Sequence, residues 1–81
     1  MNKIVKYTGG IVGVVKVHVK LYYLTGDFKL VYSVTKTVVA YDGQNECIVD
    51  VEFRGRGKYV LVVIVESWTG DFYATSRRII I

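Results

Sequence analysis

Apolar and polar residues alternate along most of this chain, and the alternation divides it into segments of strand length. A period of two places successive side chains on opposite faces of an extended strand, so each segment predicts a strand with one buried face. Clusters of glycine, aspartate and asparagine between the segments predict turns. The expected strands are Lys3–Tyr7, Ile11–Tyr23, Phe28–Ala40 with a split near Ser33–Lys36, Glu46–Arg54, Tyr59–Trp68 and Phe72–Ile81.

The parity of each segment predicts which of its faces is buried. In 46–54 the charged residues share one parity and Cys47, Val49, Val51 and Phe53 share the other, which we assign to the core. In 11–23 the odd positions from 15 to 23 are apolar, so the even positions are expected to face outward. The segment 59–68 is apolar on both parities, which is typical of a central strand covered on both sides or of a strand that presents a face to another molecule.

In 28–40 the apolar residues of the even parity are expected to share one face. They are Phe28, Leu30, Tyr32, Val34 and Val38.

Composition supports a single all-β domain spanning residues 1–81. Hydrophobic residues make up 52% of the 81 positions and charged residues 22%, as in globular proteins, and valine, isoleucine and tyrosine favour strands over helices. The one cysteine, Cys47, excludes an internal disulfide and a multi-thiolate zinc site, and we expect it to be a buried apolar side chain.

Two features bear on location. No signal peptide is evident at the N-terminus, which favours a cytoplasmic or virion-associated protein. The longest apolar stretch, Gly10–Leu24, is interrupted by Lys16, His18 and Lys20, so it is not expected to span a membrane.

The run Val38–Phe53, followed by Gly57-Lys58-Tyr59 and an alternating segment, resembles the second half of an immunoglobulin-like antiparallel sandwich. The resemblance is to fibronectin type III and CARDB-type adhesion modules, and it implies a β-sandwich of about six to seven strands. In such modules a tyrosine near the start of strand F returns its hydroxyl to the backbone, and Tyr59 fits that position. A small closed β-barrel is the alternative fold.

The resemblance also implies an order of strands. Segment 11–23 would be strand B and 46–54 strand E, so that Lys16, His18 and Lys20 would lie beside the carboxylates of Asp50 and Glu52. The turns that follow strands B and F would then lie at the same end of the sandwich.

Both of these turns contain Thr-Gly-Asp-Phe, which is either a weak repeat or the recurrence of residues that suit short hairpin loops. If the loops meet, their carboxylates and hydroxyls could approach a cation or a basic partner, with an exposed aromatic contact beside them. Otherwise these residues only form the turns. The predicted binding pole consists of Thr25, Asp27, Trp68, Thr69 and Asp71.

No residue pattern points to catalysis. One histidine and one cysteine, without a nucleophile elbow, a phosphate loop or a metal-ligand cluster, leave nothing from which to assemble an active site. His18 is expected to be a solvated strand residue. We therefore predict a protein that is not an enzyme and that needs no metal, cofactor or small-molecule substrate.

The sequence instead favours a structural or protein–protein interaction role. Phe72–Ile81 is an apolar terminal strand, which predicts self-association at an edge through Phe72, Ile79, Ile80 and Ile81, or through the apolar faces of 59–65. The expected role is assembly or adhesion by a homo-oligomer, and the composition suits a virion or surface component of a thermophile.

Nucleic-acid binding is the alternative function. The net charge is +4, and small basic β-barrels bind single strands with lysine and aromatic side chains. The residues that would carry this function are Lys16, His18, Lys20, Arg77 and Arg78.

Overall fold

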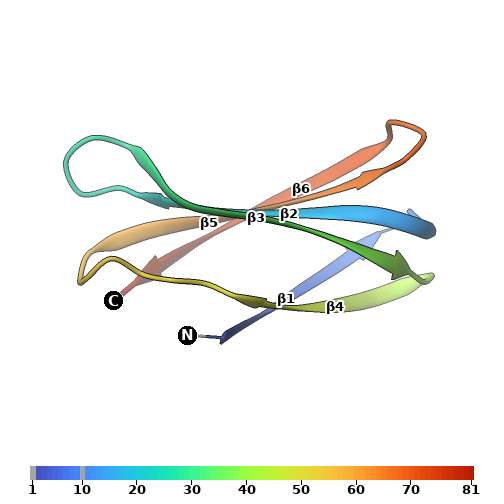
Figure 1. Ribbon diagram of the computed structural model, residues 1–81, viewed down its shortest axis with the longest axis horizontal. Helices are drawn as coiled ribbons and strands as arrows, with labels where there is room; N and C mark the ends of the chain where they lie inside the picture. The colour runs from blue at the N-terminus through green and yellow to red at the C-terminus, as the bar shows by residue number, and fades with distance from the viewer. Residues whose placement is uncertain (1, 10) are drawn as a thin grey trace.

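The computed structural model describes residues 2–9 and 11–81, which form antiparallel strands in two sheets (Figure 1). The larger sheet has the order β3-β2-β5-β6 and the smaller one pairs β1 with β4. The all-β prediction is confirmed. Each described sheet ends in strands with a single neighbour, so the closed-barrel alternative is wrong. The strands are β1 (Asn2–Gly9), β2 (Gly13–Tyr23), β3 (Lys29–Ala40), β4 (Gly43–Asp50), β5 (Lys58–Ser67) and β6 (Phe72–Ile80).

The smaller sheet lies across one face of the larger sheet, here called the inner face, and the core fills the space between them (Figure 1). The odd positions of β2 and alternate positions of the β4 segment point into this core, as predicted, and the structure adds the odd positions of β5 to them. Phe53, beyond the end of β4, packs against the core half-buried. The fully buried side chains include Val15, Val17, Val19 and Leu21 of β2, Val49 and Val51 of the β4 segment, and Tyr59 and Val65 of β5.

The chain crosses from the larger sheet to the smaller one between β3 and β4. The buried Asn45 closes this turn, because its Oδ1 accepts from the N–H of Tyr41 at 2.9 Å and its Nδ2 donates to the Tyr41 carbonyl at 2.9 Å. Lys36 Nζ of β3 donates to the carbonyl of Ile48 at 2.7 Å. The β4 edge therefore lies beside β3, and Figure 1 shows β1 on the far side, toward β6.

Tyr59 anchors the opposite end of the core. Its hydroxyl donates to the Gly55 carbonyl at 2.7 Å, which confirms the predicted return to the backbone. Its ring packs edge-on against Phe53 and tilted against Tyr23, with centroid distances of 5.0 and 5.1 Å. Gly57, just before β5, lies against the Tyr23 ring. A Cβ at this position would be 2.5 Å from the ring, and the Gly57 φ is +153°, so the position requires glycine.

The predicted split of segment 28–40 is wrong, because β3 runs unbroken from Lys29 to Ala40. The irregularity lies instead at Val31, where the register shifts so that Leu21 faces Tyr32 and Tyr22 faces Leu30. One extra residue on one strand exchanges the two faces beyond it. Leu30 therefore lies on the outer face, contrary to the uniform parity that the sequence predicts.

The expected pairing of segments 11–23 and 46–54 is also wrong. The neighbours of β2 are β3 and β5, whereas β4 pairs with β1. Lys16 consequently lies opposite Glu66 of β5, not beside Asp50 or Glu52.

The corrected faces predict very different costs for two leucine truncations. Leu21→Ala removes a fully buried side chain and should lower the free energy of unfolding by about 2–5 kcal/mol. Leu30→Ala truncates a side chain that is 46% exposed and should cost less than about 1 kcal/mol. Urea denaturation of both variants measures the difference, and similar losses would contradict the assigned faces.

Candidate interaction surface: the outer face and the β6 edge

The second face of the larger sheet, the outer face, has no described layer over it. The even-numbered residues of β5 form the centre of this face. Val60, Val62 and Ile64 are half-buried there, between neighbours on β2 and β6. The sequence left open whether this apolar row is covered or presented. Within the described residues no second layer covers this row, and the small side chains of Ala74 and Ser76 flank it on β6.

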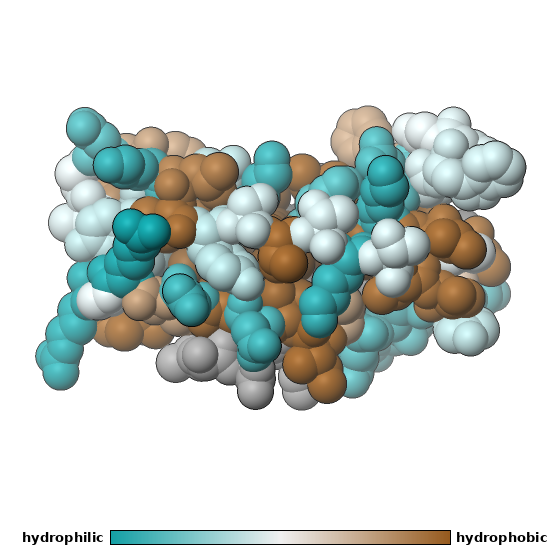
Figure 2. All heavy atoms as spheres, viewed as in Figure 1, coloured by the Kyte–Doolittle hydropathy of each residue, from teal (hydrophilic) through white to brown (hydrophobic). Residues whose placement is uncertain are grey.

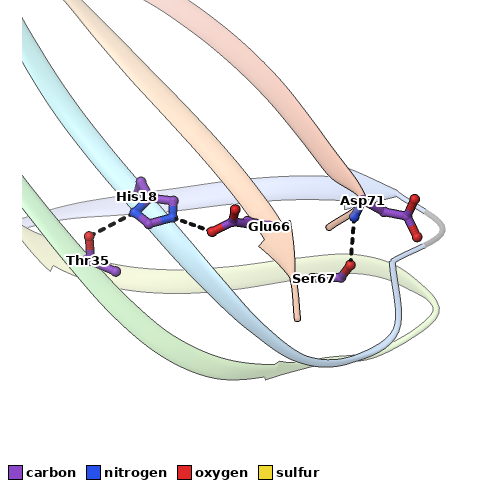
Figure 3. Close-up of polar contacts among 5 residues, drawn as sticks. All are labelled: His18, Thr35, Glu66, Ser67 and Asp71. Carbon is purple, nitrogen blue, oxygen red and sulfur yellow. Dashed lines mark hydrogen bonds and ion pairs between the residues drawn. The ribbon is translucent and has the colours of Figure 1, made fainter. Parts of the chain in front are cut away.

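His18 connects three strands on this outer face (Figure 3). Its Nδ1 lies 2.9 Å from Thr35 Oγ1 of β3, and its Nε2 lies 3.2 Å from Glu66 Oε1 of β5. The prediction of a merely solvated histidine is therefore wrong, because its side chain is only 25% exposed and holds two partners. Glu66 was missed because the sequence does not reveal that β5 neighbours β2.

A hydroxyl, an imidazole and a carboxylate in contact also resemble the order of groups in a hydrolytic triad. Thr35 and His18 are directly opposite in the β2–β3 register, and Glu66 lies diagonally across from His18 on β5. Strand β2 pairs on both sides, so the N–H groups beside His18 are used in its two ladders. We interpret the cluster as a cross-strand clamp.

The two Thr-Gly-Asp-Phe loops do not meet. Tyr23 at the end of β2 pairs with Tyr59 at the start of β5, and Val15 pairs with Ser67 at the end of β5. The β2–β3 loop and the β5–β6 loop therefore lie at opposite ends of the sheet (Figure 1). A single binding pole formed by both loops is wrong, because adjacent antiparallel strands carry their following turns to opposite ends.

The β5–β6 turn uses the polar atoms that the sequence assigned to binding. Ser67 Oγ accepts from the Asp71 N–H at 3.0 Å (Figure 3). It also lies 2.8 Å from Thr69 Oγ1. Thr69 Oγ1 also donates to Asp71 Oδ2 at 3.4 Å. These contacts support the turn-forming interpretation. In the other loop, Thr25 Oγ1 accepts from the Lys58 N–H at 3.5 Å, and Asp27 is exposed.

Trp68 protrudes from the β5–β6 turn with 86% of its surface exposed. It borders a shallow hollow of about 300 Å³ whose lining also includes Val14, Lys16 and Glu66. Tryptophan is enriched at protein contacts, and Trp68 has the exposure that such a contact requires.

The β6 edge has the position that the sequence predicts. The strand pairs with β5 and has no second described neighbour. Phe72 and Ile80 are 72% and 77% exposed on the outer face, and Ile81 is 44% exposed beyond the strand end. Ile79 differs from these, because it is half-buried and packs against the core from the inner face.

The basic residues named for nucleic-acid binding divide between two faces. Lys16, His18 and Lys20 share the outer face of β2. Arg78 lies opposite Val60 on that face, but Arg77 lies opposite the inward Leu61. The five residues therefore do not form one surface.

Comparison with protein-family models, curated protein sequences and solved structures finds no match to this chain. In the described part of the chain, no helix has the length and apolar character needed to cross a membrane.

The polar contacts of the β5–β6 turn predict a stability effect. Ser67→Ala removes the buried oxygen that accepts from the Asp71 N–H and should lower the free energy of unfolding by about 1 kcal/mol. Ser33→Ala, at an exposed position of β3, should change it by less than about 0.5 kcal/mol. Thermal denaturation measures both, and equal stabilities would contradict the role given to Ser67.

Proposed function

We propose that this protein is a non-catalytic interaction module that self-associates through the free edge of β6. The observation that carries the proposal is a regular edge strand whose register with β5 is unbroken from Phe72 to Ile80 and which exposes large apolar side chains at both ends. Such an edge offers unpaired backbone groups and apolar surface together. The biological role would be assembly or adhesion, as in a virion or a surface layer.

An immunoglobulin-like architecture is part of the proposal. The β1–β4 pair and the order β3-β2-β5-β6 are the pairings of strands B–E and C′-C-F-G in that class. The bond from Tyr59 to the Gly55 carbonyl occupies the place of the tyrosine corner at the start of strand F. This correspondence makes β2 strand C, one position later than the sequence predicts.

The other edge of the larger sheet is less suited to pairing. Strand β3 carries an irregularity opposite Leu21 and Tyr22, and Lys36 turns toward the smaller sheet to reach the Ile48 carbonyl. Bulges and inward-pointing charges are devices that protect edges. Figure 2 shows apolar and polar side chains interspersed on the side where β3 and β4 lie nearest the viewer. These features favour β6 as the associating edge.

A charge at Ile80 should dissociate the assembly. Ile80→Lys places an ammonium group on an exposed apolar position of β6, and burying it at an interface is costly. We expect the dissociation constant to rise at least about tenfold. The matched control is Val39→Lys, which alters a 55% exposed valine on β3 and should leave association unchanged.

Light scattering coupled to size exclusion, over a range of protein concentrations, measures the mass of each variant. A protein that is monomeric at every concentration, or an assembly that Val39→Lys weakens as much as Ile80→Lys, would overturn the proposal.

Nucleic-acid binding is the second candidate, and the outer face provides its support. Lys16 and Lys20 lie on β2, Arg78 lies on the same face of β6, and the rings of Tyr22 and Phe28 stack at a centroid distance of 4.8 Å. Basic side chains beside a stacked aromatic pair whose Phe28 ring is 64% exposed suit a single nucleic-acid strand, whose phosphates and bases they can contact.

This candidate predicts face-specific effects on binding of a fluorescein-labelled mixed oligonucleotide, measured by anisotropy. Lys20→Gln should weaken binding and reduce the slope of log affinity against log salt by about 0.7. Arg77→Gln, which removes the same charge from the inner face, should have a much smaller effect. No binding at low salt, or equal effects of the two variants, would exclude the outer face as the nucleic-acid site.

A further inference from the structure

We infer that two copies of this chain join β6 to β6, antiparallel, around a two-fold axis that passes between their Ser76 residues. The inference rests on the proposed self-association and specifies its partner, a second copy, and its register. Three observations lead to it: the direction of the backbone groups along β6, the order of side chains along β6, and the exposure of its two ends.

The backbone directions determine which residues can pair. Gly57 and Ile81 exchange both N–H···O bonds, at 3.2 and 3.0 Å, and the Ser67 N–H donates to the Asp71 carbonyl at 2.8 Å. In an antiparallel ladder such pairs recur at every second residue. The odd positions of β6 therefore direct their N–H and C=O groups toward β5, and the even positions, from Phe72 to Ile80, direct theirs to the free edge.

A register centred on Ser76 pairs the even positions of one copy with those of the other. The two Ser76 residues would exchange both backbone bonds, Ala74 would face Arg78, and Phe72 would face Ile80. This register overlaps the whole of β6, because Ser76 is the middle residue of Phe72–Ile80. Every outward N–H and C=O of the strand would then have a partner.

The side chains also match in this register. On the outer face, the exposed Phe72 and Ile80 meet at both ends of the pair. On the inner face, Tyr73 lies opposite Ile79, both half-buried in the single copy. Arg77 would face Thr75, so neither arginine lies directly opposite a like charge. Aromatic and β-branched pairs of this kind stabilise antiparallel strands.

Neighbouring registers are less complementary. Centring the axis on Thr75 would pair Phe72 with Arg78 and would leave Ile79 and Ile80 beyond the partner strand. Centring it on Arg77 would set the two Arg77 side chains directly opposite each other, which is destabilising. The Ser76-centred register alone places apolar residues together at both ends.

Single-cysteine variants test the register. In a Cys47→Ala background, Thr75→Cys, Ser76→Cys and Arg77→Cys are each treated with oxidised glutathione, and crosslinked dimer is followed on non-reducing gels. In the inferred register the two position-76 Cα atoms lie about 5.5 Å apart, within disulfide range. Position 75 of one copy would face position 77 of the other, so the two position-75 Cα atoms are diagonal neighbours about 7–8 Å apart, as are the two position-77 Cα atoms. We expect Ser76→Cys to crosslink at least about tenfold faster than either neighbour.

Faster crosslinking at position 75 or 77 would overturn the register. If no variant crosslinks while light scattering still shows a dimer, the inferred register is overturned but the proposed self-association stands. A protein that is monomeric throughout overturns both. If the Cys47→Ala background does not fold, the native chain replaces it, because Cys47 is only 6% exposed.

Ser76→Pro gives an independent measurement. The substitution removes an N–H that faces away from β5, so it should yield a folded monomer.

Discussion

The structure depends on burial of the inner faces of β2 and β5 beneath the smaller sheet. Val17, Val19 and Tyr59 have no exposed surface, and Val49 and Val51 of the β4 segment complete their cover. Each such side chain contributes about 1.5–3 kcal/mol when removed from water. A domain of 81 residues has a small margin of stability, and its one cysteine allows no internal disulfide to support it. This contact therefore fixes the positions of β2 and β5 at the centre of the larger sheet, and β3 and β6 pair with them on either side.

Because the smaller sheet has two strands and the larger has four, the cover is narrower than the surface below it. Lys36 of β3 reaches the edge of β4 and closes one margin. At the other margin, Thr75 and Arg77 of β6 are exposed although they lie on the inner face. Strand β6 is thus partly uncovered on its inner face, and as an edge strand it also has one free backbone edge within the described residues. This asymmetry explains why β6, and not β3, is the strand proposed for association.

Local patterns were sufficient to predict where most strands lie and which faces of β2 and β4 are buried. They did not give the strand ends, because the strand expected at 46–54 is β4 at Gly43–Asp50. Alternation is a property of the strand itself, so Cys47 and Val49 could be assigned to the core without knowledge of their neighbours. The Tyr59 contact was predicted from the resemblance to immunoglobulin-like modules, and its acceptor, the Gly55 carbonyl, lies four residues away. The bulge at Val31 was not, because Leu30 and Tyr32 continue one apolar parity in the sequence although they lie on opposite faces of the sheet.

The pairing of strands that are distant in the sequence was not predicted correctly. Once segment 11–23 was taken for strand B, the two similar loops were placed together and His18 was left without partners. The structure instead joins β2 to β5, which separates the loops and brings Glu66 to His18. Side-chain chemistry in a sheet depends on which strands are neighbours, and a single sequence carries this information only weakly.

Pairing through the β6 edge would also extend the outer face. A two-fold axis perpendicular to the sheet leaves the outer faces of both copies on the same side, so the β6 pairing would join two larger sheets into one continuous surface. Lys16 and Lys20 of one copy would then share that surface with the same residues of the other copy. A nucleic-acid strand crossing the assembly would contact both basic rows, and its affinity would rise because the second contact becomes intramolecular. Edge pairing and nucleic-acid binding are therefore compatible, and the first would strengthen the second.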